Sequence, residues 1–194
     1  MPKRKSNLQL IQQESREVSP NTSLKMRIED LITIDAMTET QGQFFSQYGA
    51  GAKAMMLHGA AGTGKTFIAL YKALEEVLQK GGFYKKVILV RSAVPSREIG
   101  HLPGDQSEKS EVYRIPYVTM CDELFPSKQQ AYQRLVEQKY LDFMITSFVR
   151  GLTLDNTIVI VDECQNLNFH ELDTIVTRVG QDSKIMFCGD FMQT

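Results

Sequence analysis

Residues 59–66 have the sequence Gly59-Ala60-Ala61-Gly62-Thr63-Gly64-Lys65-Thr66. This stretch matches the pattern G-x-x-x-x-G-K-T at every position, and it lies between an apolar run at 54–58 and a predicted helix at 65–80. Glycines let the backbone turn successive N–H groups towards phosphate oxygens, and the positive end of the helix dipole points to the same place. We therefore expect this loop to bind nucleotide phosphates, with Lys65 bridging the β- and γ-phosphates and the Thr66 hydroxyl holding Mg²⁺.

A second stretch, residues 157–163, is an aliphatic run that ends in two acids, Asp162 and Glu163. Buried carboxylates are costly, so such a pair at the end of a predicted strand indicates a chemical role. Asp162 suits the second coordination sphere of Mg²⁺, and Glu163 suits a general base that polarises the attacking water.

Amide side chains follow two of the predicted strands. Gln165 and Asn166 come directly after the acids, and Gln193 lies within 189–193, after the last predicted strand. A glutamine at this last position would sense the γ-phosphate and couple hydrolysis to motion, with a plain turn as the alternative. We take Gln193 as a third candidate catalytic residue beside Lys65 and Glu163.

Alternating patterns along the chain predict an α/β fold. Strands are expected at 54–58, 87–90, 142–148, 158–161 and 185–188. Helices are expected within 24–48, at 65–80, around 110–124, from a Ser127-x-x-Gln130 capping pattern to about 139, and from Asn168 and Glu171 to 179. Strands that alternate with crossover helices predict a mainly parallel sheet covered on both faces.

Length and composition limit the possible classes of protein. The 194 residues fit one α/β domain at 24–194 after a flexible basic and polar tail at 1–23. With 22 Lys and Arg against 23 Asp and Glu, nucleic-acid binding would need a local basic patch. Three cysteines without a C-x-x-C pair argue against a disulfide framework or a structural zinc site. The polar start and short apolar runs predict a cytoplasmic protein that does not enter a membrane.

Together these motifs resemble the PhoH-like ATPases. The similar stretches are 59–66, 162–166, 189–193 and two less generic ones, 91–104 and 150–153, whose spacing is most similar to the bacteriophage branch. The resemblance covers about 24–194. It implies a three-layer, RecA-like P-loop core related to superfamily 1 helicases, with Walker A at 59–66 and Walker B at 158–163. It also implies ATP and Mg²⁺ as cofactors, in bacterial cytoplasm or, for a phage-encoded protein, in host cytoplasm.

The same resemblance suggests contacts beyond the phosphates. Gln41, in Thr38-x-x-Gln41, would match the glutamine motif that contacts the adenine ring, and Gln43 is a nearby alternative. Arg91, Arg97 and Lys109 follow the second predicted strand and would lie on the face where related motors hold a nucleic-acid backbone.

Related ATPases usually continue beyond Asp190 through another strand and an arginine that helps to complete the site. We therefore expect the sequence to be truncated at its C-terminal end, to bind ATP and to hydrolyse it slowly. Self-association into a homo-oligomer would restore activity if Arg91 or Arg150 reaches a neighbour's γ-phosphate.

Three functions remain open at this point. The first is an ATPase that couples hydrolysis to RNA or single-stranded DNA. The second is an ATP-dependent switch or assembly factor that does not move along nucleic acid. A small-molecule kinase is the weakest, because a water-activating Glu163 beside Asp162 favours hydrolysis over transfer to an acceptor.

Overall fold

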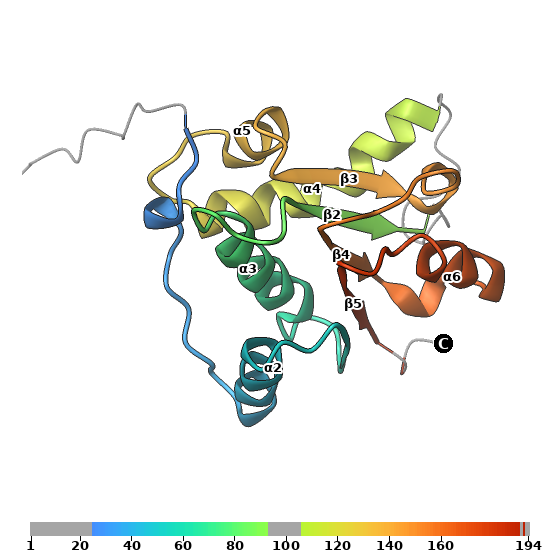
Figure 1. The fold of residues 1–194 in the computed structure, drawn as a ribbon, viewed down its shortest axis with the longest axis horizontal. Coiled ribbons are helices and arrows are strands. Elements are labelled where there is room, and N and C mark those ends of the chain that lie inside the picture. The colour runs from blue at the N-terminus through green and yellow to red at the C-terminus, as the bar shows by residue number, and fades with distance from the viewer. Residues whose placement is uncertain (1–24, 93–105, 191, 193–194) are drawn as a thin grey trace, which may run out of the picture.

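The computed structural model describes residues 25–92, 106–190 and 192, with the side chains of 106–110 left out. Its centre is one five-stranded sheet in the order β1-β5-β4-β2-β3, and every neighbouring pair is parallel (Figure 1). The strands are β1 (Ala54–His58), β2 (Lys86–Arg91), β3 (Leu141–Ile145), β4 (Thr157–Asp162) and β5 (Lys184–Gly189). The expected α/β fold is confirmed.

The described residues also form five α-helices and three short 3-10 helices, of which η1 and α2 precede β1 and the others lie between strands. The α-helices are α2 (Glu39–Gly49), α3 (Lys65–Val77), α4 (Gln106–Leu124), α5 (Ala131–Glu137) and α6 (Phe169–Val176). The 3-10 helices are η1 (Ile28–Asp30), η2 (Thr146–Phe148) and η3 (Cys164–Asn166). Within the described part of the chain, each helix is too short or too polar to cross a membrane.

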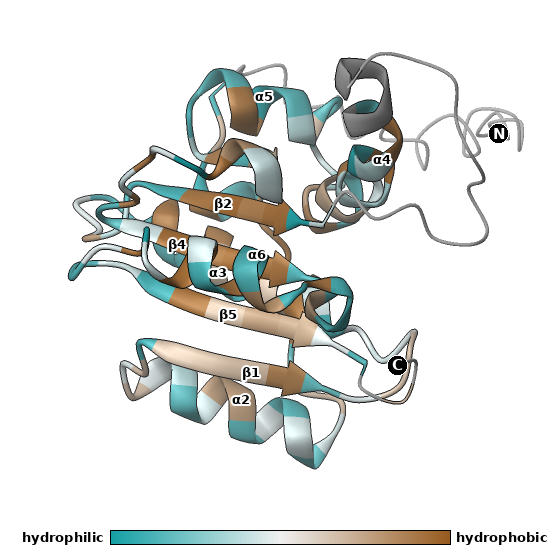
Figure 2. Cartoon of the chain, turned by 90° about the vertical axis from the view of Figure 1, so that its right-hand side faces the viewer, coloured by the Kyte–Doolittle hydropathy of each residue, from teal (hydrophilic) through white to brown (hydrophobic). Residues whose placement is uncertain are grey.

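The sheet is covered on both faces, because successive side chains of a strand point to opposite sides. On β2, Val87 and Leu89 pack into a cluster with residues of α2, α3, α4 and α5. Ile88 and Val90 pack into a second cluster that includes Ile175 of α6. The central strand β4 is buried along its whole length, as its aliphatic sequence predicts. Figure 2 shows β1 at one edge with α2 beside it.

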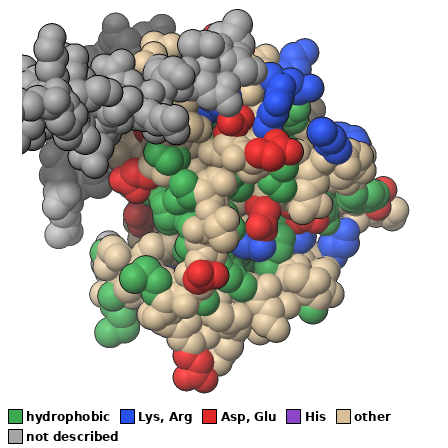
Figure 3. All heavy atoms as spheres, turned by 90° about the vertical axis from the view of Figure 1, so that its left-hand side faces the viewer, with side chains coloured by type: hydrophobic (Ala, Val, Ile, Leu, Met, Phe, Trp, Pro, Cys, Tyr) green, Lys and Arg blue, Asp and Glu red, His purple; other side chains and the backbone are tan. Residues whose placement is uncertain are grey.

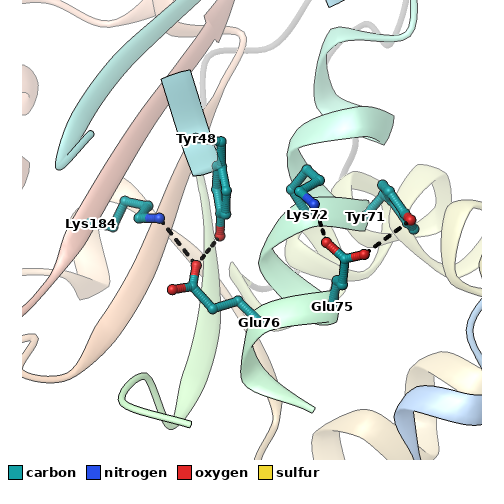
Figure 4. Close-up of polar contacts among 6 residues, drawn as sticks. All are labelled: Tyr48, Tyr71, Lys72, Glu75, Glu76 and Lys184. Atoms are coloured by element: carbon teal, nitrogen blue, oxygen red, sulfur yellow. Dashed lines mark hydrogen bonds and ion pairs between the residues drawn. The ribbon is translucent and has the colours of Figure 1, made fainter. Parts of the chain in front are cut away.

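A buried polar cluster joins α2 and α3 to the amino end of the sheet (Figure 4). Lys184, at the start of β5, forms an ion pair of 3.1 Å with Glu76 of α3, and Tyr48 of α2 donates a hydrogen bond of 2.5 Å to the same carboxylate. The Lys184 ammonium also lies 3.5 Å from the centre of the Tyr48 ring. Burial lowers the pKa of Lys184 and raises that of Tyr48. Tyr48 therefore keeps its proton and donates it to the Glu76 carboxylate.

The outer surface at the amino ends of the strands carries charges of both signs. Figure 3 shows acidic, basic and hydrophobic side chains interspersed on this face. This mixture of charges agrees with the net charge of -1, and it gives this face neither a uniformly positive nor a uniformly negative potential.

Two expected boundaries are wrong for reasons of tertiary structure. The helix expected to open at Ser127 begins at Ala131, because Asp122 of α4 accepts a hydrogen bond of 3.2 Å from the Ala131 N–H. The strand expected over 142–148 ends at Ile145, because Thr146 turns into η2 and donates a hydrogen bond to Glu171 of α6.

Other helices follow the expected pattern with shifted ends. Helix α6 opens at Asn168 and Glu171 as expected, where the two residues form a capping box with side-chain to backbone distances of 2.9 and 3.1 Å, and it ends at Val176 rather than at Val179. Helix α3 ends at Val77 rather than at Lys80. Helix α4 begins before the expected position and continues through Pro116, so it runs for 19 residues. The helix expected within 24–48 is α2, which buries Phe44 and Tyr48.

Candidate nucleotide-binding site

A cavity of about 640 Å³ lies at the carboxyl ends of β1, β2, β4 and β5. Ligands of parallel α/β sheets bind in the crevice at this edge. The residues that line the cavity come from the 59–66 loop and α3 (Ala61, Gly62, Gly64, Lys65, Thr66, Phe67), from the strand ends (Arg91, Asp162, Glu163, Cys188, Gly189, Asp190) and from α4 (Pro116, Thr119, Met120, Glu123). The structure therefore brings the two predicted motifs together.

The 59–66 loop has the backbone geometry that its glycines predict. Gly62 and Gly64 have φ angles of 75° and 78°, which side chains with a Cβ rarely adopt, and Gly64 caps the N-terminus of α3. The Lys65 ammonium donates hydrogen bonds to the carbonyls of Gly59 and Ala60, at 2.8 and 2.7 Å. A cation held over a helix N-terminus fits a phosphate chain.

Thr66 and Asp162 meet across the cavity although 96 residues separate them. The Thr66 hydroxyl donates a hydrogen bond of 2.6 Å to Asp162 Oδ1, and Asp162 is buried at the end of β4. A hydroxyl and a carboxylate side by side are oxygen ligands of the kind that Mg²⁺ prefers. These two residues therefore fit the predicted role of holding Mg²⁺.

Glu163 belongs to a chain of hydrogen bonds that reaches the phosphate loop. Gln165 donates a bond of 2.5 Å to Glu163, and its amide oxygen accepts one of 3.0 Å from the Asp190 N–H. Asp190 in turn accepts a bond of 3.1 Å from the Ala61 N–H. The sequence alone indicates no definite role for Gln165 and none for Asp190, although Asp190 lies within the 189–193 stretch. The structure places both as links between the strand ends and the loop.

The adenine contact stays a choice between two glutamines. Gln41 and Gln43 both line a second cavity of about 360 Å³, which also touches Thr63 and Lys65. Gln41 is held near the start of α2, where its side chain accepts a bond of 2.8 Å from the Met37 N–H. Gln43 donates a bond of 3.4 Å to Glu39.

Of the three cations expected to contact nucleic acid, Arg91 is the one whose side chain the structure describes. Arg91 lines the nucleotide cavity, with its guanidinium 5.5 Å from the centre of the Tyr113 ring. Arg97, the side chain of Lys109 and Gln193 lie outside the described residues.

Burial controls the ionisation of Cys188, which lines the cavity, and of Tyr117, which is buried beside Asp162. It raises the pKa of the Cys188 thiol, and the negative charge of Asp162 adds to the effect. The pKa of Tyr117 is raised for the same two reasons. Cys188 is therefore a protonated core thiol at neutral pH, and Tyr117 keeps its proton as a hydrogen-bond donor. Local sequence carried no sign of this role for Tyr117, because Asp162 lies 45 residues away.

Comparison with known proteins gives consistent matches. A family model described as PhoH-like protein matches residues 33–194. A PhoH-like protein of Bacillus subtilis is 38% identical over 136 residues, which cover 70% of this chain and 41% of that protein. Protein PhoH2 of the same organism is 36% identical over 69% of this chain and 31% of its own length. A PhoH-like protein of Synechocystis is 37% identical over 70% of this chain and 40% of its own length.

The chain thus spans less than half the length of these curated relatives. The family match nevertheless includes the 59–66 loop, Asp162 at the end of β4 with Glu163 directly after it, and the strand that ends at Gly189. Its parallel sheet is consistent with a P-loop core, and with this match over most of its length the chain belongs to the PhoH-like protein family.

Proposed function

We propose that this chain binds ATP together with Mg²⁺ and hydrolyses the terminal phosphate. The observation that carries the proposal is the contact of 2.6 Å between Thr66 and Asp162, which lies in one cavity with Lys65 and Glu163. Family membership supports ATP as the nucleotide.

Each residue has a definite part in this reaction. Lys65 exchanges its contacts with the loop carbonyls for the β- and γ-phosphates, while backbone N–H groups at the start of α3 bind phosphate oxygens. Thr66 and Asp162 hold Mg²⁺, which when bound neutralises charge on the phosphates. Glu163, fixed by Gln165, polarises the attacking water. We assign the sensing of the γ-phosphate to Gln193 and the adenine contact to Gln41, with Gln43 as the alternative.

Binding and turnover are tested separately. Calorimetry with ATP, with and without Mg²⁺, measures binding, and release of inorganic phosphate measures hydrolysis. We expect saturable binding that tightens with Mg²⁺. A folded chain that binds no ATP would contradict the proposal, and transfer of phosphate to an added metabolite would favour a kinase.

We further propose that hydrolysis is coupled to RNA or single-stranded DNA in the cytoplasm, from the resemblance to helicase cores and the cations at 91, 97 and 109. The test compares phosphate release with and without each nucleic acid, over a range of protein concentrations that also reveals a homo-oligomer. Coupling would be supported if nucleic acid stimulates phosphate release by the wild type and if Arg97→Glu and Lys109→Glu abolish this stimulation. Unchanged turnover would favour the alternative, an ATP-dependent switch or assembly factor.

The bacteriophage branch stays a prediction from the spacing within 91–104 and 150–153.

A further inference from the structure

Asp162 is held from a second side by a residue outside both motifs. The hydroxyl of Tyr117, on α4, donates a hydrogen bond of 2.7 Å to Asp162 Oδ2, while Thr66 donates to Oδ1. The Tyr117 side chain is completely buried. The two oxygens of the carboxylate therefore have different partners, one on the helix of the phosphate loop and one on a helix from another part of the chain.

The surroundings of Tyr117 keep its hydroxyl in place. Its ring packs against Phe143 of β3, with 5.4 Å between the ring centres, and Arg91 at the end of β2 interacts with the phenol. Arg91 is also the strand partner of Asp162 in the β2–β4 register. A buried aromatic ring of this kind has little freedom to rotate away, so the direction of its hydroxyl is determined by the packing of α4 on the sheet.

We propose that Tyr117 is a positioning residue for Mg²⁺, which turns the Asp162 carboxylate so that Oδ1 faces the Thr66 hydroxyl. The inference rests on the proposed function, because it concerns the same metal-binding pair. Hydrogen bonds to a metal ligand fix its orientation, and their loss typically costs about 10- to 100-fold in metal affinity.

Through Tyr117, the position of α4 would affect the binding of Mg²⁺. The same helix contributes Pro116, Thr119, Met120 and Glu123 to the wall of the nucleotide cavity. A shift of α4 therefore moves the cavity wall and the Tyr117 hydroxyl together. The conformation of α4 then determines how well Asp162 binds Mg²⁺.

The test replaces the hydroxyl and leaves the ring. Tyr117→Phe is compared with Tyr48→Phe, which also removes a buried phenol that donates to a carboxylate, here Glu76, at 2.5 Å (Figure 4). Mn²⁺ serves as the probe, and its binding to the complex with ADP is measured by electron paramagnetic resonance. ATP binding in the presence of a chelator and the melting temperature are measured for each variant.

In Tyr117→Phe we expect Mn²⁺ affinity to fall about tenfold or more, with metal-free ATP affinity within about twofold of the wild type. In Tyr48→Phe we expect a lower melting temperature and unchanged Mn²⁺ affinity. A double-mutant cycle with Asp162→Asn gives a second measure, because a hydroxyl that acts through Asp162 has no further effect once the carboxylate is gone.

Three results would overturn the inference. The first is an unchanged Mn²⁺ affinity in Tyr117→Phe, and the second is an equal loss of Mn²⁺ affinity in Tyr48→Phe. The third is a loss of Mn²⁺ affinity in the double mutant of Tyr117→Phe and Asp162→Asn that equals the sum of the two single losses. Failure of the proposed function is a different result, since a wild-type chain that binds neither ATP nor Mn²⁺ contradicts both proposals. A wild type that binds both, beside an unaffected Tyr117→Phe, contradicts this inference alone.

Discussion

At the scale of single residues, Lys65 and Glu163 line the same cavity, and under the proposed function they serve binding and turnover separately. The Lys65 ammonium is held 2.7–2.8 Å from two backbone carbonyls of the phosphate loop, so it is placed before any phosphate arrives. Glu163 is oriented by an amide from Gln165. In the proposed reaction the first side chain would contact the phosphates and the second would polarise water.

Replacing Lys65 with alanine tests the phosphate contact. We expect Lys65→Ala to weaken ATP binding roughly 30- to 1000-fold, because a charge-assisted contact to phosphate contributes on the order of 2–4 kcal/mol. Calorimetry measures the change. The matched control is Lys72→Ala on the same helix, whose partner is Glu75 and which should keep wild-type affinity. If the two folded variants bind ATP with equal affinity, Lys65 does not contact the phosphates.

Replacing Glu163 with glutamine tests the general base. The substitution keeps the shape of the side chain, so we expect Glu163→Gln to bind ATP with Mg²⁺ normally and to lose at least about 100-fold in turnover. Glu123→Gln is the control, because Glu123 is another acid at the same cavity. Phosphate release under saturating ATP distinguishes them. Turnover of Glu163→Gln within about threefold of the wild type would assign water activation to another group.

At the scale of elements, the end of β5 is packed too closely against η3 to accept a larger residue. A Cβ at Gly189 would lie 2.5 Å from the Cys164 Sγ and 2.9 Å from the Gln165 Oε1. Gln165 is the link between Glu163 and Asp190, so a displacement here affects the chemistry as well as the packing.

We therefore expect Gly189→Ala to lower the free energy of unfolding by about 1–3 kcal/mol and to reduce turnover. Gly42→Ala is the matched control, because its nearest neighbour within 4 Å is the Ala36 Cβ at 3.8 Å. In the interior of α2 that change should stabilise the fold by about 0.5–1 kcal/mol. Denaturant unfolding and phosphate release measure both effects. A Gly189→Ala variant with wild-type turnover would show that the link through Gln165 does not orient Glu163.

At the scale of the whole molecule, burial makes the fold sensitive to alkaline pH. The pKa values of Cys121 and Cys188 are raised by burial from an ordinary value of 9.0. Those of Tyr48, Tyr117 and Tyr132 are raised from 10.0, again chiefly by burial. Above these ordinary values the unfolded chain loses protons that the folded chain keeps, so stability falls as pH rises. Lys184 acts in the opposite direction, because its pKa is lowered in the folded state.

We expect the free energy of unfolding to fall from about pH 9 upward, with each buried thiol contributing about 1.4 kcal/mol per pH unit. The pKa values of Cys164 and Lys53 are raised as well, so seven of the described groups act in this direction and Lys184 opposes them, which makes the net slope negative. Urea unfolding at pH 7.5 to 10.5 measures the slope. Cys121→Ala lowers stability at every pH and should make the slope shallower by the contribution of one thiol. A flat profile to pH 10.5 would contradict this account.

The sequence by itself determined the features whose physics is local. Glycines at 62 and 64 permit a positive φ, the apolar run at 54–58 forms β1 with the expected bounds, and α6 opens at Asn168 and Glu171 as expected. Each of these depends on residues at most a few positions apart. The same holds for the aliphatic run before Asp162, which predicts a buried strand and two acids at its end.

Tertiary structure alone decided how these pieces meet. It places β5 between β1 and β4, starts α5 with a bond from Asp122, and brings Asp190 to the Ala61 N–H across 129 residues. It also directs the Tyr117 hydroxyl to Asp162. Such contacts depend on the path of the chain between distant elements and on the packing of their side chains. Local propensity and periodicity do not encode them, because a strand has the same pattern of residues whichever strand lies beside it.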